Sequence, residues 1–223
     1  MPVANLLPGF HPLMLVVMFS IPFGELQQLA LGGFSCAKLI IPFLWIYLMS
    51  VKLKSVKVHP LTGYFCLFIL FTLPSLILSD SSIRNYPSVL FSLIGYIVLL
   101  QILYEYKTTP HYIQGLTNAF ISGLFCVSFA TLIALKTGFD IGNFLGKPLV
   151  DYWYGVPLVT GTSFNPNGFG TLFAIGIPLC FGLLLSKETM FQKMLILSVL
   201  VVLVTTGFLT FSRSSIASWV LAC

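Results

Sequence analysis

The composition of this 223-residue chain excludes an ordinary soluble domain, because 57% of its residues are hydrophobic and only 8% are charged. In globular domains about a quarter of the residues are charged. A formal net charge of +5 is compatible with a nucleic-acid ligand, but the basic residues are scattered singly between apolar stretches and form no basic face or run. We therefore expect a lipid bilayer around the chain and no nucleic-acid partner.

Seven segments are apolar enough to cross a membrane, and an eighth begins at the end of the chain. A spanning helix needs about 20 mostly apolar residues, since a rise of about 1.5 Å per residue has to cover about 30 Å of hydrocarbon. In chain order the segments are 6–24, 36–51, 61–79, 86–105, 114–136, 166–186 and 192–210, and 214–223 opens the last one. This pattern predicts an all-α fold, a polytopic transmembrane helical bundle that forms a single domain over residues 1–223.

The eighth segment ends after ten residues (214–223), which is about half of what a bilayer requires. A natural chain rarely ends inside such a helix. We therefore expect the chain to be the N-terminal part of a longer protein, truncated at its C-terminus.

The basic residues of the connecting loops predict the orientation, because cytoplasmic loops are enriched in Lys and Arg. The loops after the second, fourth and sixth segments lie on one side and hold six bases: Lys52, Lys54, Lys57, Lys107, Lys187 and Lys193. The opposite side holds five, partly offset by acidic residues: Lys38, Arg84, Lys136, Lys147 and Arg213. We expect a multi-pass inner-membrane protein whose N-terminus is cytoplasmic.

The loop from about Thr137 to Phe164 lies on the outer side and is the longest hydrophilic stretch. Its seven glycines and prolines argue against a regular element. Trp153 and Tyr154 favour the headgroup level of a membrane, so we expect this loop to lie back on the membrane surface. It is either a simple interfacial connection or part of a site.

Two polar stretches interrupt the apolar pattern, Thr160–Gly168 before the sixth segment and Thr205–Ser215 at the end of the seventh. Asn165-Pro166 is a good helix start, because Asn caps free N–H groups and Pro has a suitable φ at the first helical position. The alternative is functional: Asn167 and the free amides of this helix start would face a polar cavity and favour an anionic group.

Arg213 and Arg84 are the candidate anion ligands. An Arg costs roughly 2.5 to 3.5 kcal/mol at mid-membrane on insertion scales, so Arg213 either extends to the interface from a helix end or pairs with a ligand. Its five donors suit bidentate binding of phosphate, which Lys cannot provide. Arg84 either pairs with Asp80 at helical i,i+4 spacing or acts as a second ligand.

The Phe-Asn-Pro-Asn-Gly stretch that opens one membrane helix and the Thr-Phe-Ser-Arg-Ser-Ser stretch that closes the next resemble the O-antigen ligase and polymerase family of bacterial envelope glycosyltransferases. The resemblance covers residues 160–223, and the rest of the chain agrees only in its helix rhythm. The small residue that usually follows the Arg is here Ser214.

The resemblance implies an undecaprenyl-diphosphate-linked glycan donor, which is passed at the periplasmic face to a hydroxyl of a glycan or lipid acceptor. By analogy Arg213 would hold the diphosphate and stabilise the charge of the leaving group, and Arg84 and Asn167 would assist. Transfer in the family is independent of metals, so no cofactor is expected, and the five cysteines lack the spacing of a metal site.

This chain departs from the family in one respect that affects catalysis. Family members usually continue through further helices and a large periplasmic loop that supplies Arg and His residues. The histidines of this chain all fall on the predicted cytoplasmic side: His11, His59 and His111. The candidates for acceptor activation are therefore Asp140 and Asp151, and the fragment alone is expected to lack part of the catalytic machinery.

Two other functions remain open. In a transporter or flippase of lipid-linked glycans or other anions, Arg84 and Arg213 would line a path across the bilayer. Such a path needs polar residues near the bilayer midplane, whereas the charges of this chain sit at segment ends, which favours the transferase. A non-catalytic assembly subunit is the third interpretation.

Overall fold

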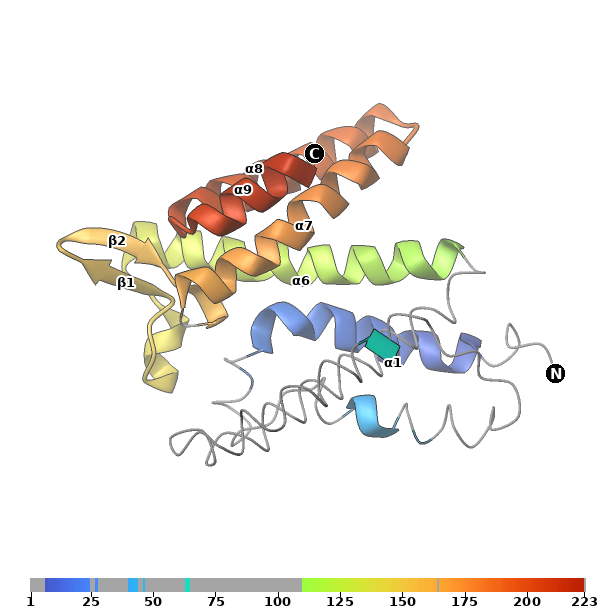
Figure 1. The fold of residues 1–223 in the computed structure, drawn as a ribbon, viewed down its shortest axis with the longest axis horizontal. Helices are drawn as coiled ribbons and strands as arrows, with labels where there is room; N and C mark the ends of the chain where they lie inside the picture. Colours follow the sequence, from blue (N-terminus) through green and yellow to red (C-terminus); the bar gives the residue numbers. More distant parts are fainter. Residues whose placement is uncertain are drawn as a thin grey trace. The chain divides into compact units, whose positions relative to one another are not determined.

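Helix dominates this computed structural model, which describes residues 7–24, 27, 40–43, 46, 63, 64, 110–163 and 165–222. Figure 1 labels the described α-helices and strands. In chain order the described elements are α1 (Leu7–Ser20), η2 (Ile21–Phe23), α6 (Pro110–Thr137), η3 (Ile141–Leu145), β1 (Val150–Trp153), β2 (Val156–Val159), η4 (Gly161–Ser163), α7 (Pro166–Ser186), α8 (Met190–Leu209) and α9 (Arg213–Ala222). The predicted segments 36–51, 61–79 and 86–105 lie wholly or almost wholly outside the described residues, and so does Arg84.

Three of the described helices, α6, α7 and α8, are long and apolar enough to cross a membrane. They confirm the helices predicted at 114–136, 166–186 and 192–210, and α9 begins one residue before the predicted eighth segment. Helix α1 has 14 residues and contains Pro12, so at about 1.5 Å per residue it covers roughly 21 Å. Its described length is therefore less than the thickness of the hydrocarbon layer.

The amount of protein cover differs between these helices. Protein buries 44% of the most apolar 18-residue stretch of α6, whereas it buries only 17% of the corresponding stretch of α8. Most of the exposed side chains of α8 are nevertheless apolar, among them Phe191, Leu195 and Val201, and its one charged residue, Lys193, lies in the first turn. A largely apolar exposed surface needs an apolar environment, so the surface of α8 indicates a membrane protein.

Contacts divide the chain into two compact units. The first unit comprises Met1–Met14 and Ala37–Gln114, and the second comprises Leu15–Cys36 and Gly115–Cys223. In the first unit the ring of Tyr112 lies 4.4 Å from that of His11 and 4.0 Å from that of His111, centroid to centroid. The second unit contains every candidate site residue that the structure describes.

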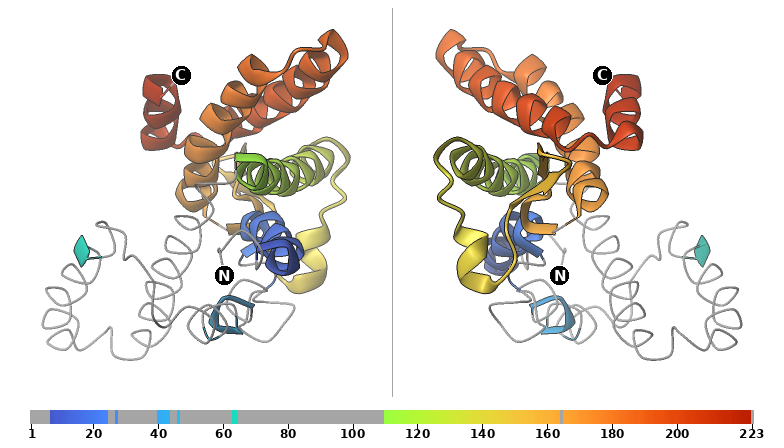
Figure 2. Two further views of the ribbon diagram at one scale, coloured as in Figure 1. Left: turned by 90° about the vertical axis from the view of Figure 1, so that its right-hand side faces the viewer. Right: turned by 90° about the vertical axis from the view of Figure 1, so that its left-hand side faces the viewer.

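Helix α7 is the centre of the second unit, since it packs against both α8 and α9, as Figures 1 and 2 show. The core is formed by one apolar cluster, which contains Phe120, Ile121, Leu124, Val127, Val159, Phe169, Phe173, Ile177, Cys180 and Leu203. Small residues let the backbones approach. A methyl group on Gly176 would lie 2.4 Å from a Leu124 methyl carbon, and one on Gly123 would lie 2.2 Å from the Phe19 carbonyl oxygen.

The prediction that the loop between α6 and α7 contains no regular element is wrong. Strands β1 and β2 form an antiparallel hairpin in which Val150 pairs with Val159 and Trp153 with Val156. The two turn residues, Tyr154 and Gly155, have φ values of 50° and 79°, and a two-residue type I′ turn requires positive φ at both positions. The glycines of this loop lie outside the two strands, at turns or in η3 and η4, and leave the β-branched and aromatic runs free to pair.

Candidate functional site

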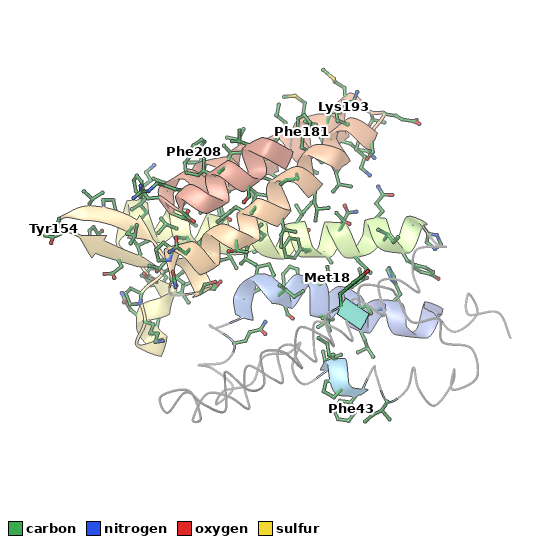
Figure 3. All side chains as sticks on the ribbon, in the orientation of Figure 1. Met18, Phe43, Tyr154, Phe181, Lys193 and Phe208 are labelled. Carbon is green, nitrogen blue, oxygen red and sulfur yellow. The ribbon has the colours of Figure 1, made fainter. Side chains whose placement is uncertain are left out.

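The described charged residues of the second unit lie at two opposite ends of its helices. Figure 3 shows Tyr154 at the apex of the hairpin and Lys193 at the far end, near the turn between α7 and α8. Within α6, α7 and α8 the only Asp, Glu, Lys or Arg residues are Lys136 in the last turn of α6 and Lys193 in the first turn of α8. The middle of each described span is therefore free of charge.

The start of α7 confirms the predicted capping. The Asn165 side chain accepts a hydrogen bond from the Asn167 N–H at 2.9 Å, its carbonyl accepts one from Phe169 at 2.9 Å, and Pro166 is the first helical residue. The bond to Asn167 uses one of the N–H groups that a helix start otherwise leaves free, and the bond from Phe169 is the first regular bond of the helix. The Asn167 side chain itself is exposed and has no hydrogen-bond partner in the described part of the chain.

The residues Gly161 and Thr162, which precede this cap, each contact another segment of the chain. Gly161 has a φ of 54°, and a methyl group there would lie 2.4 Å from the Phe169 ring, so both its backbone and its surroundings require glycine. The Thr162 hydroxyl donates a hydrogen bond to the carbonyl oxygen of Pro22 in η2. The chain therefore enters α7 along a fixed path.

Helix α9 starts in a different way. Phe211, in the turn after α8, has a φ of 52°, a conformation that costs roughly 1–2 kcal/mol for a residue with a side chain. The Ser212 carbonyl then accepts a hydrogen bond from Ile216 at 3.0 Å, and Arg213 is the first helical residue. The strained turn thus places a guanidinium at the start of a helix.

The Arg213 side chain is exposed, and no described residue accepts a hydrogen bond from it or forms an ion pair with it. A helix N-terminus carries a partial positive charge, so a cation at this position is unfavourable unless an anion is near. An anionic group would interact favourably with both the guanidinium and the free amides.

The structure places Asn167 and Arg213 at the same end of the second unit. Helix α8 runs antiparallel to α7 and to α9, and α7 packs against both (Figure 1). The second residue of α7 and the first residue of α9 are therefore at the end where the hairpin lies. Arg84 is outside the described residues, so its proximity to this pair stays a prediction.

The two candidate carboxylates differ in their surroundings. Asp140 is buried, and its oxygens accept hydrogen bonds from the N–H groups of Gly142 at 2.7 Å, Leu149 at 2.6 Å and Val150 at 3.2 Å. This carboxylate links the start of the loop to β1 and has little capacity left for a proton of an acceptor hydroxyl. Asp151 lies exposed on β1, where its side chain accepts a hydrogen bond from the Tyr152 N–H at 2.8 Å.

Phe211 is the feature of this region that sequence reasoning missed. A left-handed conformation is expected at Gly or Asn, and no pattern in the sequence marks a phenylalanine for it.

No group of three or more His, Cys, Asp or Glu side chains among the described residues is arranged to hold a metal ion. The chemistry of the region is therefore described by the Arg213 guanidinium, the Asn167 amide and the two helix starts. No protein family, curated protein or solved structure matches this chain.

Proposed function

We propose that this chain is an integral-membrane glycosyltransferase-like protein of surface-polysaccharide assembly. It would transfer or polymerise an undecaprenyl-diphosphate-linked glycan at the periplasmic face of the bacterial inner membrane. Its full bundle would contain seven helices and the start of an eighth, with the N-terminus in the cytoplasm. The observation that carries the proposal is the exposed Arg213 guanidinium at the start of α9, which has no anionic partner among the described residues.

The leaving group of such a reaction is a lipid diphosphate, on which negative charge develops as the glycosidic bond breaks. A donor group that is already oriented toward this charge lowers the barrier, because it needs no reorganisation during the reaction. The fork of Arg213 matches two phosphate oxygens, and the starts of α7 and α9 add partial positive charge at the same end. Asn167 would donate a neutral hydrogen bond to the same group.

The depth of the charges supports a transferase over a transporter. A path across the bilayer needs polar or ionisable groups near the midplane, and α6, α7 and α8 have no charged residue there. Of the candidate ligands, Asn167 and Arg213 instead lie at one end, where the diphosphate of a membrane-anchored donor would be found.

On the acceptor side, Asp151 is the better placed of the two carboxylates. Its side chain is exposed on the hairpin, whereas three backbone N–H groups occupy the oxygens of Asp140. In this proposal Asp151 would orient the attacking hydroxyl of a glycan or lipid acceptor, and Asp140 would hold the loop on which Asp151 is carried.

The test is complementation of a strain from which the full-length gene that encodes this chain has been deleted, with each variant made in that full-length gene. Wild type, Arg213→Ala, Arg213→Lys and Lys136→Ala are expressed at equal membrane levels, and the length of the surface glycans is measured on gels. Lys136→Ala is the matched control, because it removes an exposed cation from the same end of the helices.

We expect wild type and Lys136→Ala to restore long glycans and Arg213→Ala to fail. Arg213→Lys should restore them only in part, since an ammonium cannot form the bidentate contact. Full restoration by Arg213→Ala would mean that the Arg213 side chain only extends to the membrane interface and does not bind the diphosphate. An unchanged surface glycan in the deletion strain would favour the transporter interpretation.

A further inference from the structure

In the segment 139–144, which follows α6, the one charged residue is buried and three large apolar side chains are exposed beside the polar Asn143. Asp140 is only 8% exposed, whereas Phe139, Ile141 and Phe144 are 59%, 48% and 77% exposed. In water a charged side chain stays at the surface and large apolar side chains are covered. This segment has the reverse arrangement within six residues.

Backbone contacts keep the segment in this orientation. The buried Asp140 carboxylate receives three N–H groups, from Gly142, Leu149 and Val150. Gly142 fits tightly behind it, because a methyl group there would lie 2.2 Å from the Lys147 carbonyl oxygen. The polar atoms are therefore satisfied on the inner side, and the apolar side chains are left on the outer side.

The position of the segment identifies what covers these side chains. Helix α6 is a candidate membrane span that ends at Thr137, and a chain extends by at most about 3.6 Å per residue. Phe139 thus lies within roughly 7 Å of the helix end and Phe144 within roughly 25 Å. The last turns of α6 expose further apolar side chains, Phe129 and Ile133, so the apolar surface continues from the span into the segment.

The charge pattern also fits lipid. Between Gly138 and Gly146 the only ionisable side chain is the buried Asp140, so the exposed side of the segment offers nothing that would bind a charged partner. The rings of Phe139 and Phe144 contact each other edge to face, with centroids 6.0 Å apart. Aromatic side chains next to the end of a span are typical of the boundary between headgroups and acyl chains.

We propose that residues 139–144 form an interfacial anchor, in which Phe139, Ile141 and Phe144 insert into the lipid at the end of α6 while Asp140 holds the backbone above them. This assigns the membrane contact of the loop to a different place from Trp153 and Tyr154. Tyr154 is 91% exposed at the hairpin apex and points away from the helices (Figure 3). The anchor is independent of the proposed glycosyl transfer.

The test measures quenching of a single tryptophan by brominated lipids. In the full chain Trp45, Trp153 and Trp219 are replaced by Phe, and Phe144→Trp introduces the reporter. The protein is reconstituted in phosphatidylethanolamine and phosphatidylglycerol vesicles with bromine atoms near the headgroup end of the acyl chains. Tyr154→Trp in the same background is the matched control, and Phe139→Trp is a second reporter for the case that Phe144→Trp does not fold.

We expect blue-shifted emission from Phe144→Trp that loses most of its intensity in brominated vesicles, and little loss from Tyr154→Trp. Red-shifted, unquenched emission from Phe144→Trp would place the segment in water and overturn the proposal. Blue-shifted emission that brominated lipid does not quench would mean that protein covers the segment, either another part of this chain or a second copy, and would overturn it as well.

Discussion

The starts of α7 and α9 lie at the same end of the second unit, but they are built differently. At α7, Asn165 caps a free amide and Pro166 supplies a suitable φ, so local backbone chemistry accounts for both residues. At α9 the chain passes through a strained Phe211 and places the Arg213 cation at the positive end of a helix. Neither of these features favours the helix. The first start therefore stabilises the folded chain, whereas the second carries a local cost that a nearby anion would offset.

The largest expected effect belongs to Arg213→Ala. Removing one donor that stabilises developing charge typically lowers a rate by about 10²–10³, so we expect a loss of that size in glycan transfer from a lipid-diphosphate donor in proteoliposomes. The free energy of unfolding in detergent should change by less than about 0.5 kcal/mol, because the side chain is exposed. A large loss of stability combined with normal transfer by the folded fraction would mean that Arg213 stabilises the fold and does not act in transfer.

Gly161→Ala should have the largest effect on stability. The substitution forces a side chain into a φ of 54° and against the Phe169 ring, which together should cost roughly 2–4 kcal/mol. Denaturant titration in mixed micelles measures the loss. Gly182→Ala in the same helix bundle is the control, since open space surrounds that glycine. Equal stability of the two variants would contradict the fixed path into α7.

Asn165→Ala tests the role of the cap at the start of α7. Loss of the cap should lower the free energy of unfolding by about 1 kcal/mol, and Asn165→Asp should retain most of it. Transfer per folded molecule is expected to stay normal in both variants. If Asn165→Ala reduced transfer as strongly as Arg213→Ala at equal folding, the start of α7 would belong to the site itself.

Phe211→Gly should have the smallest effect, and in the opposite direction. Relief of about 1–2 kcal/mol of strain is partly cancelled by the greater freedom of glycine in the unfolded chain, about 0.5–1 kcal/mol. The net expectation is a gain of roughly 0.5 kcal/mol, read as a higher unfolding midpoint. A clear loss of stability would show that the exposed phenylalanine ring has a binding partner.

The helices α6, α7 and α8 could be predicted to within a few residues because long apolar runs have no other stable arrangement in a membrane. The helix start at Asn165-Pro166 was also predictable, because capping depends only on the residues at the helix boundary. Arg213 could be placed at the end of a span from its charge. Its position relative to Asn167 could not, because this depends on how α9 folds back onto α7.

The loop between α6 and α7 was predicted less well, although its sequence held usable signals. The run Val150–Trp153 and the run Val156–Val159 flank a two-residue turn ending in glycine, which indicates a hairpin, but the high glycine content suggested irregular structure instead. For Asp140, a glycine two residues later is typical of a side chain that binds nearby backbone N–H groups. Its contacts with Leu149 and Val150 depend on the folded loop and have no local signal.

The hydrogen bond from Thr162 to the Pro22 carbonyl joins residues 140 positions apart in the chain, and this separation constrains biogenesis. At a synthesis rate of about 5–20 residues per second, Thr162 leaves the ribosome roughly 7–28 s after Pro22. During that interval Pro22, in η2, lacks the partner that it has in the folded second unit. The contact that fixes the entry into α7 can therefore form only after residues 1–162 have been synthesised.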